Sequence, residues 1–124
     1  IMSKVRADRV KESSLVIGTN DVSLLGAGTG FVNFADVCQD GDIFDYAITH
    51  ETSGEWESGV GTYQALNNSV LRTTVAGSSN SNNKVDLSSG YKNIFITVNS
   101  ATFTDLDKTI SKTGSTALAI AFGA

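Results

Sequence analysis

The stretch "IFDYAITHETSGEWESGVGTY", residues 43–63, has the pattern of a β-hairpin. In its first half, apolar and polar residues alternate, so that Phe44, Tyr46 and Ile48 fall on one face of an extended strand. "ETSG" then supplies turn residues, and Gly54 can adopt the positive φ that such a loop often needs. The second half returns as the partner strand. We therefore predict an antiparallel hairpin at this position.

The second strand of the hairpin places different residue types on its two faces. Trp56 and Val60 share one face, and we expect that face to lie in the core. The opposite face carries two carboxylates and two glycines: Glu55, Glu57, Gly59 and Gly61. Because a strip without side chains lets a neighbouring backbone or ring lie close, we expect protein to pack on the glycines. Gly59 and Gly61 are therefore interface candidates.

Other segments of the chain also predict strands, separated by polar turns. They are "RVKESS", "DVSLLGA", "VLRTTVAG", "KVDL" and "IFITVNS", residues 9–14, 21–27, 70–77, 84–87 and 94–100. The polar run "SSNSNNK" between two of them is typical of a surface loop. In "GFVNFADVCQDGD" the apolar residues Phe31, Phe34 and Val37 recur every third residue, which favours one short helical turn near residues 31–38. The fold class predicted is all-β, a single antiparallel β-sandwich or barrel domain.

The end of the chain differs from the rest. We expect a β domain with an N-terminal arm over residues 1–98 and an extension over residues 99–124. The extension ends in "ALAIAF", where larger apolar side chains alternate with alanines, and its interface candidates are Ala117, Leu118, Ile120 and Phe122. This strand either closes the domain's own sheet or docks on a neighbour. The chain contains no proline, a residue that often guards sheet edges, so we expect the edges to be closed or covered by other subunits.

Composition restricts the classes of partner. The net charge of -4 and a pI near 4.7 argue against a general nucleic-acid binder. The longest apolar stretch is too short to cross a bilayer. Cys38 is the single cysteine and is expected to be a small buried hydrophobe. Basic residues gather near the N-terminus, either as a solvated arm or as an anion-binding patch, and Lys4, Arg6 and Arg9 are interface candidates.

Catalytic chemistry has little support in the sequence. Glycoside hydrolysis uses two carboxylates about 5–10 Å apart across a cleft. Glu55 and Glu57 meet the lower separation as same-face neighbours, but no other feature builds a cleft around them. His50 is the only histidine and falls in a turn, where an exposed polar residue is expected. We therefore predict no catalytic residue.

Cofactor and metal signals are also weak. The aspartates Asp36, Asp40, Asp42 and Asp45 surround a glycine, but their spacing matches no EF-hand and a turn of this composition needs no metal. A structural calcium ion stays open as an alternative. "GAGTG", residues 26–30, lacks the lysine and Ser/Thr of a phosphate-binding loop and indicates a flexible connection. No cofactor is predicted.

Several motifs follow one another in a familiar order. They are "DRVKESS", "GFVNFADV", "GEWESGVGTY", "LRTT" followed by "SSN", and "SSGYKNIFIT". In this order the chain, from Asp8 to Val98, resembles a small β domain that recurs in virion proteins of tailed bacteriophages, of tail or tail-fibre type. The resemblance implies that the motifs build the domain and do not catalyse a reaction. It implies a structural role for Arg9, Gly54, Trp56, Gly59, Gly61, Tyr63 and Arg72.

The expected function is therefore that of a structural component of a bacteriophage virion, in the tail, a tail-fibre or adaptor, or the capsid decoration. Its expected partners are copies of itself, as a trimer or hexamer, and neighbouring virion proteins, with no nucleic acid and no membrane. Assembly would use sheet-edge pairing and apolar burial. One alternative is a carbohydrate-binding module for host-receptor recognition, in which Tyr63 or Tyr91 stacks on a glycan. Another is an enzyme that uses Glu55 and Glu57.

Overall fold

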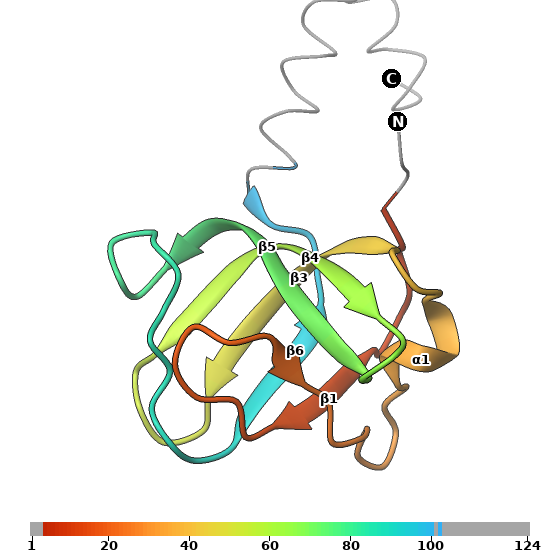
Figure 1. Ribbon diagram of the computed structural model, residues 1–124, viewed down its shortest axis with the longest axis horizontal. Helices are drawn as coiled ribbons and strands as arrows, with labels where there is room; N and C mark the ends of the chain where they lie inside the picture. The colour runs from red at the N-terminus through yellow and green to blue at the C-terminus, as the bar shows by residue number, and fades with distance from the viewer. Residues whose placement is uncertain (1–3, 101, 103–124) are drawn as a thin grey trace, which may run out of the picture.

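The predicted central hairpin is present in the computed structural model, which describes residues 4–100 and 102. Strand β3 (Ile43–His50) pairs antiparallel with β4 (Trp56–Gln64). The other strands are β1 (Lys11–Ser14), β2 (Val22–Ser23), β5 (Ser69–Ser78) and β6 (Lys92–Ile96). They form one antiparallel sheet in the order β1-β6-β3-β4-β5-β2, which curls into a nearly closed barrel (Figure 1). The all-β prediction is confirmed.

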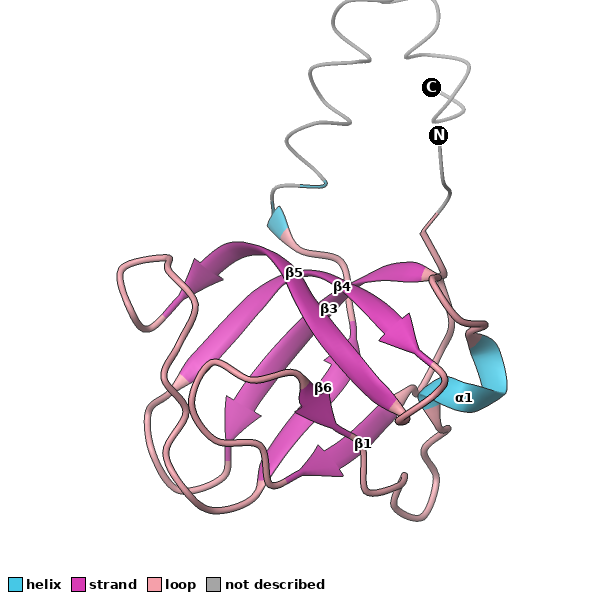
Figure 2. Cartoon of the chain, in the orientation of Figure 1, coloured by secondary structure: helices cyan, strands magenta, loops and turns pink. Residues whose placement is uncertain are grey.

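The barrel nearly closes because backbone hydrogen bonds join edge strand β1 to the segment that follows the other edge strand, β2. Ser13 N in β1 donates to Gly26 O at 3.3 Å, and Leu25 N donates back to Ser13 O at 3.0 Å. Leu25 and Gly26 follow β2 directly, so the segment after one edge strand pairs with the other edge strand. Figure 2 shows the strands wrapping around a common interior. The chain's own backbone therefore covers these edges.

Apolar side chains from every strand but β1 and from the connecting loops fill the barrel. Phe44, Tyr46 and Ile48 are fully buried, as their alternation in β3 predicts. The short helix α1 (Phe34–Val37) lies within the predicted helical segment, and its Phe34 ring packs against Phe44 with 5.1 Å between ring centroids. Cys38 is buried next to the helix, as expected, and burial raises the pKa of its thiol to about 11. The helical turn thus contributes a core residue to the barrel.

The assignment of faces in β4 is wrong. Trp56 is 44% exposed, and the inward-facing residues of this strand are Glu57, Gly59, Gly61 and Tyr63. Alternation correctly predicted which residues of β4 share a face. The expectation that the face with Trp56 lies in the core was wrong. The inward carboxylate is stable because a buried arginine neutralises it, as described below. The Trp56 ring lies on the outside of the barrel, next to Gly77 of β5.

Two further sequence predictions differ from the structure. "KVDL" forms no strand, although Val85 and Leu87 are both buried, and Leu87 makes a single antiparallel bridge with Gly18. His50, expected to be exposed, is only 8% exposed. Its Nδ1 accepts hydrogen bonds from the amides of Thr52 and Ser53 and so organises the turn between β3 and β4. The ring is a local structural element of the hairpin.

We predict that Gly59→Ala strongly destabilises the protein. A Cβ at this position would lie 1.9 Å from the carbonyl oxygen of Thr74 in β5, next to the β-bulge between the two strands. Overpacking of this kind against backbone costs about 2 kcal/mol or more of unfolding free energy, measured by urea denaturation. Gly54→Ala, in the same hairpin, is the control, because its Cβ would have nothing within 4 Å. Equal stability of the two variants would contradict the packing described here.

Candidate functional site

The strongest polar feature is an ion pair inside the barrel. Arg72 of β5 and Glu57 of β4 have fully buried side chains, and two hydrogen bonds join them, Nη2 to Oε1 at 2.5 Å and Nε to Oε2 at 2.8 Å. Tyr46 of β3 donates its hydroxyl to Glu57 Oε2 at 2.5 Å, and the amide of Val85 donates to Oε1 at 2.8 Å. The other arginine donors bind backbone carbonyls of Gly18, Asn20 and Val85. The pair therefore ties three strands to two loops.

These contacts fix the charge state of the cluster. Burial alone would raise the pKa of the Glu57 carboxyl, but the hydrogen bonds from Arg72, Tyr46 and Val85 outweigh burial and hold that pKa below its ordinary value. Burial and the neighbouring carboxylate raise the pKa of Tyr46, so its hydroxyl stays a donor. Glu57 is thus an ionised acceptor whose oxygens are both engaged.

The geometry separates the two glutamates that the sequence offered as an enzymatic pair. Glu57 lies inside the barrel, bound on both oxygens. Glu55 lies at the surface, where its carboxylate accepts hydrogen bonds from the amide and the hydroxyl of Ser88. These bonds lower the pKa of Glu55. The two carboxylates therefore bind the same loop, the one between β5 and β6, but Glu57 binds it inside the barrel and Glu55 at the surface.

A second buried carboxylate gathers the two ends of the described chain. Asp45 of β3 is fully buried, with Lys4 Nζ 3.0 Å from its Oδ1 and Arg6 Nη1 3.0 Å from its Oδ2. From the other end, the Asn99 side-chain amide and the Thr102 hydroxyl also donate to Asp45, at 3.2 and 2.9 Å. Lys4 additionally donates to Thr102 at 3.0 Å. We call this set of five residues the Asp45 clamp.

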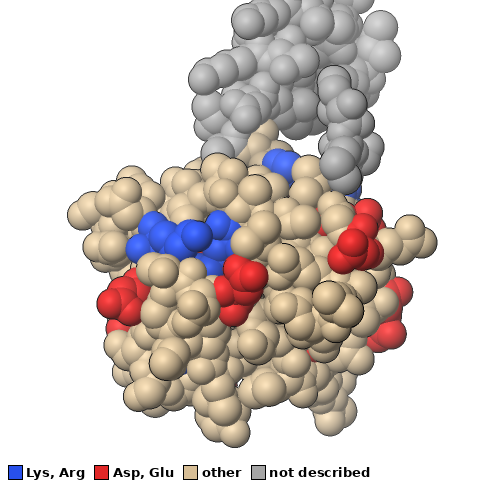
Figure 3. Space-filling model, viewed as in Figure 1, with Lys and Arg blue, Asp and Glu red and all other residues tan. Residues whose placement is uncertain are grey.

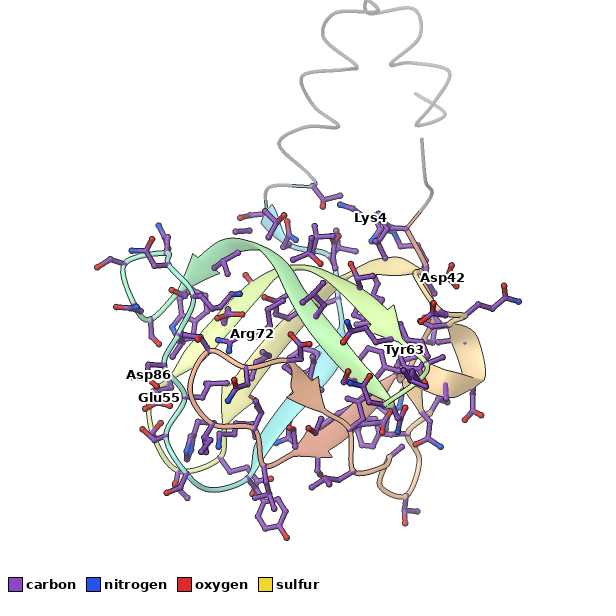
Figure 4. All side chains as sticks on the ribbon, viewed as in Figure 1. Lys4, Asp42, Glu55, Tyr63, Arg72 and Asp86 are labelled. Carbon is purple, nitrogen blue, oxygen red and sulfur yellow. The ribbon has the colours of Figure 1, made fainter. Side chains whose placement is uncertain are left out.

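The clamp explains why Asp45 is buried although its strand position faces outward. Burial would raise the pKa of its carboxyl, but the hydrogen bonds from Lys4, Arg6 and Thr102 lower it overall. Figure 4 places Lys4 at one end of the barrel, and Figure 1 shows that both ends of the described part of the chain lie there. The N-terminal arm is therefore fastened to the barrel.

The interface candidates are found in several environments. Lys4 and Arg6 bind Asp45 of their own chain. Gly59 and Gly61 are buried, and the close neighbours that their bare strip predicts belong to the same chain: the backbone of β5 against Gly59, and core side chains against Gly61. The candidates of the extension, Ala117, Leu118, Ile120 and Phe122, lie outside the described residues. Arg9 is exposed and belongs to a surface groove.

This groove lies along β1 and β6 on the outside of the barrel. It has a volume of about 320 Å³ and is lined by Arg9, Val10, Lys11, Phe31, Phe95 and Ile96. The Arg9 guanidinium carbon lies 4.2 Å from the Phe31 ring centroid, and Lys11 Nζ lies 4.8 Å from it. We call this surface the Phe31 groove. Of these residues, only Arg9 is an interface candidate from the sequence. Arg9 precedes β1 and has φ +63, so its position beside Lys11 does not follow from strand alternation.

A buried carboxylate also holds the loop beside the groove. Glu12 of β1 accepts hydrogen bonds from the amides of Gly26 and Phe34, at 2.9 and 2.7 Å. Burial raises the pKa of its carboxyl above the ordinary value. Gly26, the first residue of "GAGTG", has φ +114, a conformation that favours glycine. The backbone around this glycine-rich segment therefore binds an internal carboxylate.

Other candidate residues have structural environments. Tyr63 is buried and donates its hydroxyl to Asn68, so it is not placed to stack on a glycan, whereas Tyr91 is 54% exposed. Asp40 and Asp42 accept backbone hydrogen bonds from Ala65 and Gln39. Within residues 4–100 and 102, no group of three metal-ligating side chains is present. In the same residues no helix is long and apolar enough to cross a membrane.

Comparison of the chain with protein-family models, with curated proteins and with solved structures finds no match. The resemblance to a phage virion domain therefore stays a prediction.

We predict that Arg72→Met costs about 3–5 kcal/mol of unfolding free energy, because it leaves the Glu57 carboxylate buried without its cation. The control is Arg6→Met, the same substitution at a half-exposed arginine. Lys4 still pairs with Asp45 in that variant, so we expect a loss of about 1 kcal/mol or less. Denaturant unfolding measures both values. A similar loss of unfolding free energy in the two variants would show that the buried pair contributes no more to stability than the half-exposed one.

The unfolding free energy should depend on pH in the direction set by the pKa shifts of these carboxylates. Glu57 and Asp45 have lowered pKa values in the folded state, so their stabilisation is present above the unfolded values of about 4 and is lost as pH falls further. Glu12, with a raised pKa, has the opposite sign and stabilises most below that range. We therefore expect the gap in unfolding free energy between wild type and Glu57→Gln to narrow as pH falls below about 4. Urea titrations across this range test it, and a constant gap would exclude Glu57 as the titrating group.

Proposed function

We propose that the chain is a structural component of a bacteriophage virion, in the tail, a tail-fibre or adaptor, or the capsid decoration, and that it acts through contacts with copies of itself and with neighbouring virion proteins. The order of the sequence motifs supports the virion assignment. The observation that carries the proposed mode of action is the Asp45 clamp. It fastens the N-terminal arm and the segment ending at Thr102 to one end of the barrel. Attached segments on both sides would therefore meet at one defined point.

The described surface supports assembly by side-chain contacts. Strands β1 and β6 already have backbone partners on both sides, so pairing of a new strand along them would require existing hydrogen bonds to break. Exposed apolar side chains include Leu15, Ile17 and Leu25, which with Val16 line one further hollow. Figure 3 shows a face on which most of the surface is uncharged. These features suit contact with protein better than with a polyanion.

A carbohydrate-binding module is the second proposal, and one observation favours it. Trp56 and Tyr91 are 44% and 54% exposed, and exposed aromatic rings can stack on sugars. Tyr91 therefore replaces Tyr63 as the residue to test. Loss of glycan-array binding in Tyr91→Ala, with binding retained in the buried-ring variant Tyr63→Phe, would support this function over assembly alone.

We predict that removing residues 103–124 abolishes or weakens self-association and incorporation into particles. The cut after Thr102 keeps Asn99 and Thr102 on Asp45, so the clamp is intact in the truncated protein. Light scattering after size-exclusion chromatography gives the oligomer, and mass spectrometry of purified particles detects incorporation. An unchanged oligomer and unchanged incorporation would show that the extension is not the assembly element. Absence of the full-length chain from particles would refute the virion assignment itself.

A further inference from the structure

The Phe31 groove joins an apolar floor to positive charge that lacks an acidic partner. In the described part of the chain, neither Arg9 nor Lys11 forms a salt bridge, whereas Lys4 and Arg6 both do. Arg9 Nε donates to the carbonyl of Gly30 at 3.2 Å, which holds its guanidinium near the Phe31 ring. Two like charges over one ring repel each other, and a bound anion relieves that repulsion. The groove is therefore suited to a carboxylate.

The floor of the groove adds a requirement for an apolar group. Phe31, Phe95 and Ile96 are half-buried, and they line the 320 Å³ volume together with the stems of the two basic residues. Two further hollows share residues with it: Ile96 borders one beside Arg6 and Val98, and Phe31 borders one beside Gly28 and Asn93. Of the acidic side chains around these hollows, Asp8 lies at one end, and Glu12 is committed to backbone amides. An elongated peptide with alternating acidic and apolar side chains matches this surface.

The chain itself contains such a peptide in "DLD", Asp105-Leu106-Asp107, which begins three residues after Thr102, the last described residue. We propose that the Phe31 groove of one copy binds the Asp105–Asp107 segment of a second copy, with Leu106 on the aromatic floor and the two carboxylates at Arg9 and Lys11. This inference rests on the proposed self-assembly and names its contact surface. It also explains why the groove combines two basic side chains with an apolar floor, because the segment has two carboxylates and a leucine.

The position of the clamp favours a second copy over the same chain. Asn99 donates to Gly59 O, which places the exit from the barrel over β3 and β4. The Phe31 groove lies over β1 and β6, on the other side of Asp45 in the sheet order. Asp105 is three Cα–Cα steps from Thr102, and three steps span about 11 Å at most when extended. The same segment of another copy is tethered to that copy's own barrel, so the tether does not fix it relative to this groove.

Charge reversal tests the proposal in the full-length chain. One variant carries Arg9→Glu and Lys11→Glu in the groove, and another carries Asp105→Lys and Asp107→Lys in the segment. We expect each variant alone to self-associate on the order of tenfold more weakly than wild type or worse, and an equimolar mixture of the two to regain association. Sedimentation velocity measures both effects. Lys84→Glu, at an exposed lysine away from the groove, is the control and should associate like wild type.

A third variant tests the apolar part of the contact. Phe95→Ala keeps both charges and should weaken association as well, and circular dichroism with thermal unfolding checks that each variant is folded.

The possible outcomes separate this inference from the proposed function. If wild type associates and the reversed variants associate equally well, the groove is not the contact and assembly itself stands. If each variant alone is monomeric and the mixture stays monomeric, pairing between the segment of one copy and the groove of another is refuted. If wild type is monomeric at every concentration and absent from particles, the proposed function fails and this inference fails with it.

Discussion

The buried pair of Arg72 and Glu57 is the interaction on which the barrel depends. An unpaired carboxylate in this interior would cost several kcal/mol of folding free energy. Glu57 of β4 can therefore point inward only because Arg72 of β5 supplies the guanidinium. The same guanidinium binds carbonyls in two loops that have little regular structure, and the same carboxylate holds Tyr46 and Val85. One arginine therefore joins β4 and β5 to two loops. Apolar burial supplies the bulk of the stabilisation, and the ion pair fixes which strand face turns inward.

The buried charged groups of this protein hold its own segments together. Four of the buried charged groups, Glu12, Asp45, Glu57 and Arg72, bind groups within the chain that are distant in sequence. In the described part of the chain, these buried charged side chains bind loops and chain ends that lie outside the strands. On the outside, the Phe31 groove and the exposed rings of Trp56 and Tyr91 remain accessible for contact with other molecules.

The sequence predicted the fold class because alternation is a local property. The inward residues of β3, the hairpin turn and the helical turn at Phe34 all followed from spacing within a few residues. The orientation of β4 did not, because it depends on a partner fifteen positions away that no local pattern connects to Glu57. The carboxylate hypothesis failed for the same reason, since a glutamate bound on both oxygens looks identical in sequence to a free one. The groove was missed because Phe31, Lys11 and Phe95 meet only after the barrel has formed.

The Asp45 clamp has a mechanical consequence. A pulling force applied between residue 4 and residue 102 enters and leaves the barrel at the same end, through side chains that bind one carboxylate and one another. Tension would pass across this short bridge and leave the six strands unloaded until the bridge breaks. In such an arrangement the barrel lies outside the load path, and the hydrogen bonds around Asp45 set the force at which the strands begin to bear load.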